Sequence, residues 1–196
     1  MAVVALFAAL TAIGAFIKIP IPYVPFTLQY LFCALAGVFL GAKLGAYSQL
    51  LYVGIGLAGV PVFTEGGGVA YILKPTFGYL IGFIVAAFVI GKITEECRRI
   101  HFKNTFFAVL SGLFFVYLFG VIHLYLIYNL YLGDAKTFGW AILYGFILCI
   151  GGDLILSAIV AIIATKTVPI LRREGFLSNS SIISSKVNIN IESEEV

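Results

Sequence analysis

The run Phe138–Thr165 contains a single charged residue, Asp153. A run of this length is long enough to cross a bilayer, which takes about 20 apolar residues. An ionised side chain near the middle of a membrane helix costs about 2.5–3.5 kcal/mol on insertion scales, so it usually faces a partner, a cavity or a ligand instead of lipid. Asp153 therefore predicts a membrane-spanning helix that presents its carboxylate to one of these three.

The composition agrees with a membrane fold. Of the 196 residues, 62% are hydrophobic and 11% are charged, whereas a soluble domain carries roughly 25% charged residues. A chain with so little charge cannot cover its own surface in water. The sequence therefore predicts one all-α integral membrane domain.

The apolar runs predict six transmembrane helices, and the basic residues test their arrangement. Six spans place both termini on one side of the membrane. Nine of the 12 lysines and arginines then lie on that side, which is the asymmetry expected when the termini are cytoplasmic. The predicted spans are Ala2–Ile17, Phe26–Leu40, Leu44–Val60, Thr76–Gly91, Thr105–Leu130 and Phe138–Thr165. The basic residues on the cytoplasmic side are Lys43, Lys92, Arg98, Arg99, Lys103, Lys166, Arg172, Arg173 and Lys186, and those on the outer side are Lys18, Lys74 and Lys136.

The C-terminal segment differs in composition from the rest of the chain. From about Leu177 it is rich in Ser and Asn and ends in acidic residues. Such a segment cannot bury enough apolar surface to order itself. We predict that residues 1–170 form the membrane domain and that residues 171–196 are a disordered cytoplasmic tail.

The two larger outer loops are unusually apolar. The first, Ile19–Pro25, holds three prolines, which favour an extended backbone. The second, Ala58–Pro75, combines apolar and aromatic residues with the triple glycine Gly66–Gly68, which has the backbone freedom of a hinge. Apolar surface of this kind normally marks a binding site or a partner. We expect a lid over a cavity that opens outward, with simple packing at the membrane interface as the alternative.

No catalytic motif is present in the sequence. There is no histidine pair on one helix face, no GxSxG turn and no phosphate-binding loop. A lone aspartate does not support two-metal chemistry, and the three cysteines lack metal-ligand spacing. The sequence predicts neither an enzyme nor a metal or cofactor site, and any ATP hydrolysis must belong to other subunits.

Small-molecule binding then remains for Asp153. An ionised carboxylate only accepts hydrogen bonds, so it selects a ligand with N–H donors. The outer lysines Lys18, Lys74 and Lys136 would attract an acidic group on the same ligand, or else extend to the membrane surface. The alternative for Asp153 is a hydrogen bond between helices without any ligand.

Small residues recur at four-residue spacing in the first span. Ala5 is followed by Ala9, and Ala8 by Ala12. Small side chains let another membrane helix approach closely. The spacing is equally compatible with packing inside the bundle and with contact to another membrane subunit.

Several ordered motifs occur between about Ala2 and Ala164. They are Ala5–Ala12, Pro20–Gln29, Leu40–Ala46, Ser48–Tyr52, Gly56–Phe63, the triple glycine, Pro75–Phe83 and Gly152–Ile155. Together they resemble the BioY family, the biotin-specific substrate-binding (S) components of energy-coupling factor (ECF) transporters.

The resemblance implies capture of biotin from outside, with high affinity, by a multi-pass protein of a prokaryotic cell membrane. It also implies that a transmembrane scaffold subunit and two ATPases drive transport, and that Ala5, Ala9 and Ala12 contact the scaffold. The ureido N–H groups of biotin suit Asp153. The further expected substrate-binding residues are Phe26, Thr27, Gln29, Gly67, Gly68, Tyr71, Lys74 and Tyr79.

One position departs from the family pattern. A lysine commonly follows the aspartate by three residues in the family, whereas this chain has Leu156 there. We expect Lys74 to take over the contact with the biotin carboxylate. The alternatives are a different vitamin or biotin relative as ligand, or a membrane scaffold without a small ligand.

Overall fold

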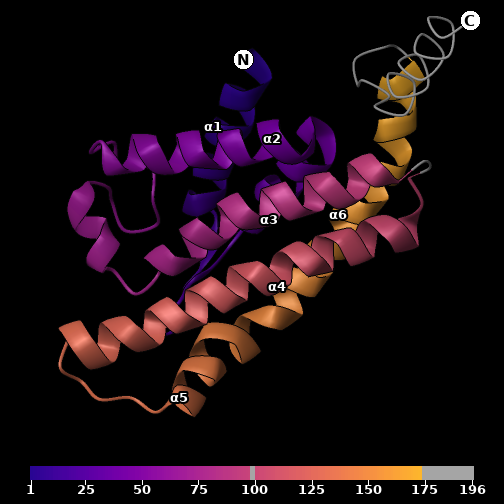
Figure 1. Cartoon of the computed structure of the whole chain (residues 1–196). Coiled ribbons are helices and arrows are strands. Elements are labelled where there is room, and N and C mark those ends of the chain that lie inside the picture. Colours follow the sequence, from indigo (N-terminus) through magenta and orange to yellow (C-terminus); the bar gives the residue numbers. More distant parts are fainter. Residues whose placement is uncertain (98–99, 174–196) are drawn as a thin grey trace, which may run out of the picture.

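The computed structural model describes residues 1–97 and 100–173, with side chains described to residue 170. Figure 1 shows helices packed along one another, with the N-terminus and the end of the last helix toward the top. The helices are α1 (Ala2–Phe16), α2 (Gln29–Leu57), α3 (Phe77–Glu96), α4 (Phe102–Leu126), α5 (Phe138–Ile142) and α6 (Leu148–Arg173). Two π-helical turns, η2 (Ile127–Tyr131) and η3 (Leu143–Ile147), and a 3₁₀ turn, η1 (Val69–Leu73), complete the helical elements.

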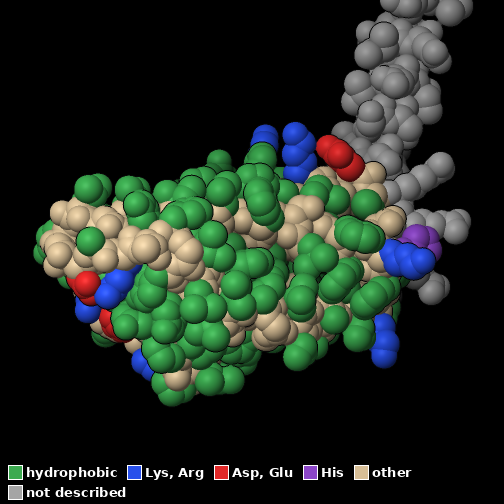
Figure 2. Space-filling view, turned by 90° about the horizontal axis from the view of Figure 1, so that it is seen from below, with side chains coloured by type: hydrophobic (Ala, Val, Ile, Leu, Met, Phe, Trp, Pro, Cys, Tyr) green, Lys and Arg blue, Asp and Glu red, His purple; other side chains and the backbone are tan. Residues whose placement is uncertain are grey.

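By length and composition alone, four helical stretches in the described part of the chain could cross a membrane. They are Gln29–Leu57, Phe77–Glu96, Phe102–Tyr131 and Phe138–Ile170, whereas α1 is shorter, with 15 residues. In Figure 2 hydrophobic side chains cover the visible face, and charged side chains gather toward its two ends. This distribution suits a protein surrounded by lipid between two aqueous surfaces.

Helix α2 folds back on itself at Gly41, where φ is 79° and ψ is −175°. A Cβ placed on Gly45 would lie 3.0 Å from the Cα of Gly37, although eight residues of straight helix would span about 12 Å. Further along, Gln29 Nε2 donates to Tyr52 Oη at 2.8 Å. The two halves of α2 are therefore antiparallel, and they overlap the predicted spans Phe26–Leu40 and Leu44–Val60. That each half crosses the membrane stays a prediction.

The turn at Gly41 is stabilised by α3. The Glu95 carboxylate accepts a hydrogen bond from the Ala42 N–H at 3.0 Å. Ala42 begins the second half of α2, where backbone N–H groups lack helical partners and the helix dipole favours a negative charge. The predicted three-residue connection Gly41–Lys43 is thus only one non-helical residue long.

The core lies where α2, α3, α4 and α6 meet. Cys33 and Gly37 bring α2 close to the backbone of α3, and Cys33 Sγ donates to the Phe83 carbonyl at 3.3 Å. Helix α4 packs on the other side of α3 and also contacts α6. The shared interior places residues of all four helices around one pocket.

The first outer loop contains a short antiparallel hairpin that the all-α expectation did not include. Its strands, β1 (Lys18–Ile19) and β2 (Phe26–Thr27), pair Lys18 with Thr27 and Ile19 with Phe26. The prediction that Phe26 begins a span was therefore wrong, because the three prolines between the two strands, Pro20, Pro22 and Pro25, hold this segment extended.

Other predicted boundaries shift by a few residues. Helix α3 runs to Glu96, past the predicted end at Gly91, and α6 is helical to Arg173, past the predicted domain end at residue 170. The rest of the predicted tail, 174–196, and the residues Arg98 and Arg99 lie outside the described residues.

Candidate binding pocket

A pocket opens between the four core helices and the two outer loops. It contains about 570 Å³ of empty space, part of it open to solvent. Ligand pockets are typically mainly apolar with few polar groups. Here the apolar and aromatic part of the wall is formed by Val24, Pro25, Phe26, Leu80, Phe83 and Val116.

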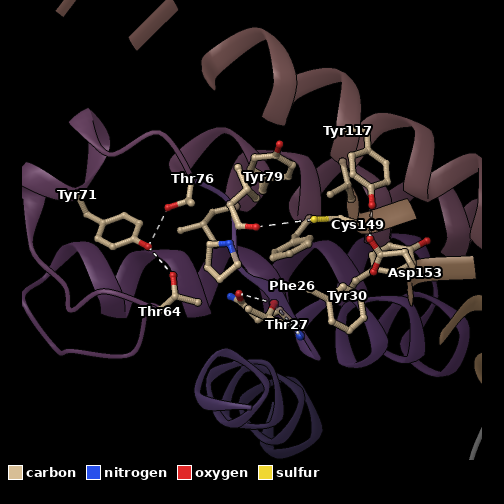
Figure 3. Close-up of a pocket in the computed structure, with 16 residues that line it drawn as sticks. Phe26, Thr27, Tyr30, Thr64, Tyr71, Thr76, Tyr79, Tyr117, Cys149 and Asp153 are labelled. Carbon is tan, nitrogen blue, oxygen red and sulfur yellow. Dashed lines mark hydrogen bonds between the residues drawn. The ribbon is translucent and has the colours of Figure 1, made fainter. Parts of the chain in front are cut away.

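Asp153 lies at one end of this pocket (Figure 3) and is 7% exposed. Tyr117, on α4, donates its hydroxyl to Asp153 Oδ2. The other carboxylate oxygen, Oδ1, is buried and has no hydrogen-bond partner among the described residues. Asp153 also forms no ion pair within that part of the chain. A buried, unpaired acceptor is costly, so Oδ1 is suited to a donor on a ligand.

The position of Asp153 depends on the glycine that precedes it. A Cβ on Gly152 would lie 2.5 Å from the ring of Phe26. The missing side chain lets Phe26, on β2, lie against α6 beside the carboxylate. The outer hairpin and the last helix thus form one wall of the pocket together.

Two other tyrosines in the wall use their hydroxyls for internal contacts. Tyr79, on α3, donates to the Gly145 carbonyl at 2.7 Å, and Tyr30, on α2, donates to the Val109 carbonyl at 2.6 Å. Both side chains are buried. Tyr79 was predicted to bind the substrate. Its hydroxyl is already bonded within the protein, so mainly its ring is left for that contact.

Gln29 and Thr27 are also engaged within the protein. Thr27 Oγ1 donates to Gln29 Oε1 at 3.0 Å, and Gln29 Nε2 donates to Tyr52 Oη, which in turn donates to the Val62 carbonyl at 3.1 Å. This chain of hydrogen bonds joins the first outer loop, both halves of α2 and the second outer loop. It holds the two loops over the pocket.

At the other end of the pocket, three hydroxyl groups form a chain. Tyr71 Oη lies 2.9 Å from Thr64 Oγ1 and 3.1 Å from Thr76 Oγ1. All three residues line the pocket, and Figure 3 shows them opposite Asp153 and Tyr117. Tyr71 is 3% exposed, and its ring packs at 4.5 Å from that of Phe63.

Three predicted residues do not line the pocket. Lys74 is half exposed and forms an ion pair with Glu65 at 3.2 Å. Gly67 and Gly68 lie in the second outer loop beside it, outside the wall. Gly68 has a φ of 97°, which favours glycine. The backbone conformation of this turn therefore favours glycine at position 68. That the triple glycine acts as a hinge stays a prediction.

The remaining charged residues of the outer loops lie apart from Asp153. Lys18 Nζ donates to the Thr64 carbonyl at 3.0 Å. Lys136 pairs with Asp134 at 2.9 Å, and the hydrogen bond to that carboxylate raises the pKa of Lys136. His123, on α4, lies outside the pocket wall, with its Nε2 at 3.2 Å from the Lys74 carbonyl oxygen.

The sequence did not single out several residues of the pocket wall. Tyr30, Thr64, Thr76, Tyr117 and Cys149 all line it. Tyr117 had a usable signal, because a polar group within a membrane span needs a partner and Asp153 needs a donor. The others had none that distinguishes them from ordinary packing residues.

The alanines of α1 divide between two faces. Ala5 and Ala9 are exposed, Ala8 is buried, and Ala12 is partly buried. One small-residue row therefore packs inside the protein and the other faces outward.

The comparisons with known proteins agree with one another. The profile of the BioY family matches residues 1–173. The chain is 46% identical over 172 residues to the probable biotin transporter BioY of Lysinibacillus sphaericus, covering 88% of both chains. It is 39% identical over 162 residues to the biotin transporter BioY of Thermotoga maritima, covering 82% of this chain and 90% of the relative.

A solved structure has the same fold. It is the crystal structure of the S-component for biotin from an ECF-type ABC transporter, which superposes with a TM-score of 0.73 at 27% sequence identity. The match covers 84% of this chain and 88% of the solved chain.

Proposed function

The chain belongs to the BioY family, and we propose that it is the biotin-binding S component of an ECF transporter and takes up biotin. The resemblance expected from the sequence motifs is confirmed. The family consists of transporter components, so the chain is not an enzyme. The observation that carries the assignment in this molecule is the free, buried Oδ1 of Asp153 in a largely apolar pocket.

Biotin matches this pocket in its chemistry. Its ureido ring offers two N–H donors, which suit the Asp153 carboxylate and would satisfy Oδ1. Its thioether ring and aliphatic chain suit the apolar wall that includes Phe26, Leu80 and Phe83. We therefore place the ureido ring of biotin at the Asp153 end of the pocket and its aliphatic tail along the apolar wall. We expect high affinity because the site is already formed.

The Leu156 position affects the charge balance at this end. Leu156 is buried and does not line the pocket. Asp153 thus relies on Tyr117 and on the ligand, without a neighbouring cation in the described part of the chain. Lys74, which we expected to compensate, is engaged by Glu65 outside the pocket wall.

For the membrane topology we propose six spans, with both termini in the cytoplasm of a prokaryotic cell. The antiparallel halves of α2 supply two of them, next to α1, α3, α4 with η2, and the segment from α5 to α6. This order brings Lys18, Lys74 and Lys136 to one surface. The residues that these lysines hydrogen-bond or pair with, Thr64, Glu65 and Asp134, all belong to the outer loops.

We further propose that the exposed alanines Ala5 and Ala9 contact the transmembrane scaffold subunit of the ECF module, with Ala12 at the edge of this contact. Two ATPase subunits would then supply the energy. The chain itself would need no cofactor, since biotin is its cargo.

The test is calorimetry with the purified chain in detergent, with thiamine and riboflavin as competing vitamins. We expect biotin to bind in a one-to-one ratio and the other two not to bind. Binding of another vitamin in place of biotin would assign a different cargo. A folded protein that binds none of the three would point to a scaffold without a small ligand.

A further inference from the structure

The polar groups of the pocket differ in how much hydrogen-bonding capacity they have left. Thr27, Gln29, Tyr30 and Tyr79 use their side-chain groups within the protein. Asp153 keeps a free acceptor, Oδ1. A further free donor lies in the hydroxyl chain of Thr64, Tyr71 and Thr76, at the opposite end (Figure 3).

This hydroxyl chain always has one donor to spare. Three hydroxyls carry three hydrogens, and the two links at 2.9 and 3.1 Å use two of them. If both threonines donate to Tyr71, the phenol hydrogen is free. If the chain runs in one direction, the hydrogen of the terminal threonine is free. The group can therefore reorient to donate to a ligand without breaking its own links.

We propose that Thr64, Tyr71 and Thr76 form the subsite for the carboxylate of the ligand, a role that rests on the proposed function. A free acceptor at one end and a free donor at the other match a molecule with N–H groups at one end and a carboxylate at the other. Hydrogen bonds to a charged acceptor are about twice as strong as those between neutral groups.

The charges around the subsite support this assignment. The Lys18 ammonium is bonded to the backbone carbonyl of Thr64 at 3.0 Å, so a positive charge lies beside the hydroxyl chain. Lys18 forms no ion pair within the described part of the chain, whereas Lys74 is neutralised by Glu65. The subsite is thus built from neutral donors with a nearby cation, instead of a direct contact to Lys74.

The experiment compares biotin with an analogue in which a methyl group replaces the carboxylate. The measured quantity is the ratio of the two dissociation constants, which does not depend on the fraction of protein that is folded. The wild type should prefer biotin by about 10-fold or more, and Tyr71→Phe and Thr76→Val should remove most of this preference.

Two further variants serve as controls. Lys74→Ala should keep the preference, and Asp153→Asn should weaken both ligands by the same factor. Equal weakening of both ligands by Tyr71→Phe and Thr76→Val would overturn the subsite, as would loss of the preference in Lys74→Ala. If the wild type binds neither ligand, the proposed function itself is wrong.

Discussion

The ring of Tyr23 stands edge-on to the ring of Trp140, with centroids 4.8 Å apart and planes at 75°. Tyr23 also meets Tyr144 at 4.9 Å and Tyr128 at 6.0 Å. It has a φ of 69° and is the one non-glycine residue with positive φ in the described part of the chain. The first outer loop is thus anchored on η2, α5 and η3 through a single side chain.

The anchored loop also closes the pocket, since Val24 and Phe26 line its wall. We predict that Tyr23→Ala accelerates biotin dissociation by roughly 10-fold, because edge-on aromatic pairs contribute about 0.5–1.5 kcal/mol each. The measurement is stopped-flow dissociation of bound biotin. Tyr23→Phe keeps the ring and should behave as wild type. Tyr131→Ala removes an exposed tyrosine and is the matched control.

A second prediction concerns Asp153. Asp153→Asn replaces the charged acceptor by a neutral amide, so biotin affinity should fall by about 10–100-fold, the range for a hydrogen bond to a charged group. Asp134→Asn is the control, since Asp134 is exposed and pairs with Lys136. Calorimetry measures the dissociation constant of biotin for both variants. Unchanged affinity in Asp153→Asn would refute the assigned site even if the protein binds biotin.

A third prediction uses the cysteines of the native chain. Cys149 lines the pocket, and its Sγ lies 3.8 Å from the Val24 carbonyl. Cys97 directly follows the C-terminal end of α3 and does not line the pocket. Biotin at 100 times its dissociation constant should slow the modification of Cys149 by methyl methanethiosulfonate up to about 100-fold, because about 1% of the sites stay free. Mass spectrometry quantifies both sites. Protection of Cys97 to the same degree would mean that biotin acts on global stability instead.

The sequence predicted the helices well because lipid-facing runs are apolar along their whole length. The reversal at Gly41 was also predicted, as a boundary between two short spans. Because these runs are apolar along their whole length, the sequence did not reveal which face of each helix turns inward. The contact of Tyr117 with Asp153 joins residues 36 positions apart and depends on the rotation of α4 about its axis. Uniformly apolar helices carry no such phase information.

The outer loops were harder to predict than the spans. Lys74 was expected to contact the ligand, but it lies outside the pocket wall and pairs with Glu65, across the turn at Gly66–Gly68. Thr64 and Thr76 became candidates only when the loop geometry brought both to Tyr71. Loop residues contact one another according to backbone turns, and sequence spacing alone does not specify these.

A fourth prediction tests the reversal in α2. Gly41→Ala should lower the free energy of unfolding by about 1–3 kcal/mol from the backbone alone, because φ of 79° with ψ of −175° is a region that essentially only glycine adopts. The added Cβ would also overlap the Glu95 carboxylate and disturb its bond to Ala42. Thermal unfolding in detergent measures the loss. Gly54→Ala lies in the same helix with open space around it and should be neutral or slightly stabilising. Equal stability of both variants would contradict the role of Gly41.

The last prediction separates transport from binding. Ala9 is exposed on α1, and a larger side chain there would keep a partner helix away without touching the pocket. Ala9→Leu should therefore abolish biotin uptake by cells that express the complete transporter, while the purified variant binds biotin as the wild type does.

Ala8→Leu is the contrasting variant, because Ala8 is buried within the protein. Overpacking at such a site typically costs 1–3 kcal/mol of stability, so this variant should lose thermal stability and uptake together. If Ala9→Leu keeps full uptake, the outward row of α1 faces lipid alone, and the scaffold must contact another surface. If it loses binding as well, the row supports the fold, and its exposure has no role in assembly.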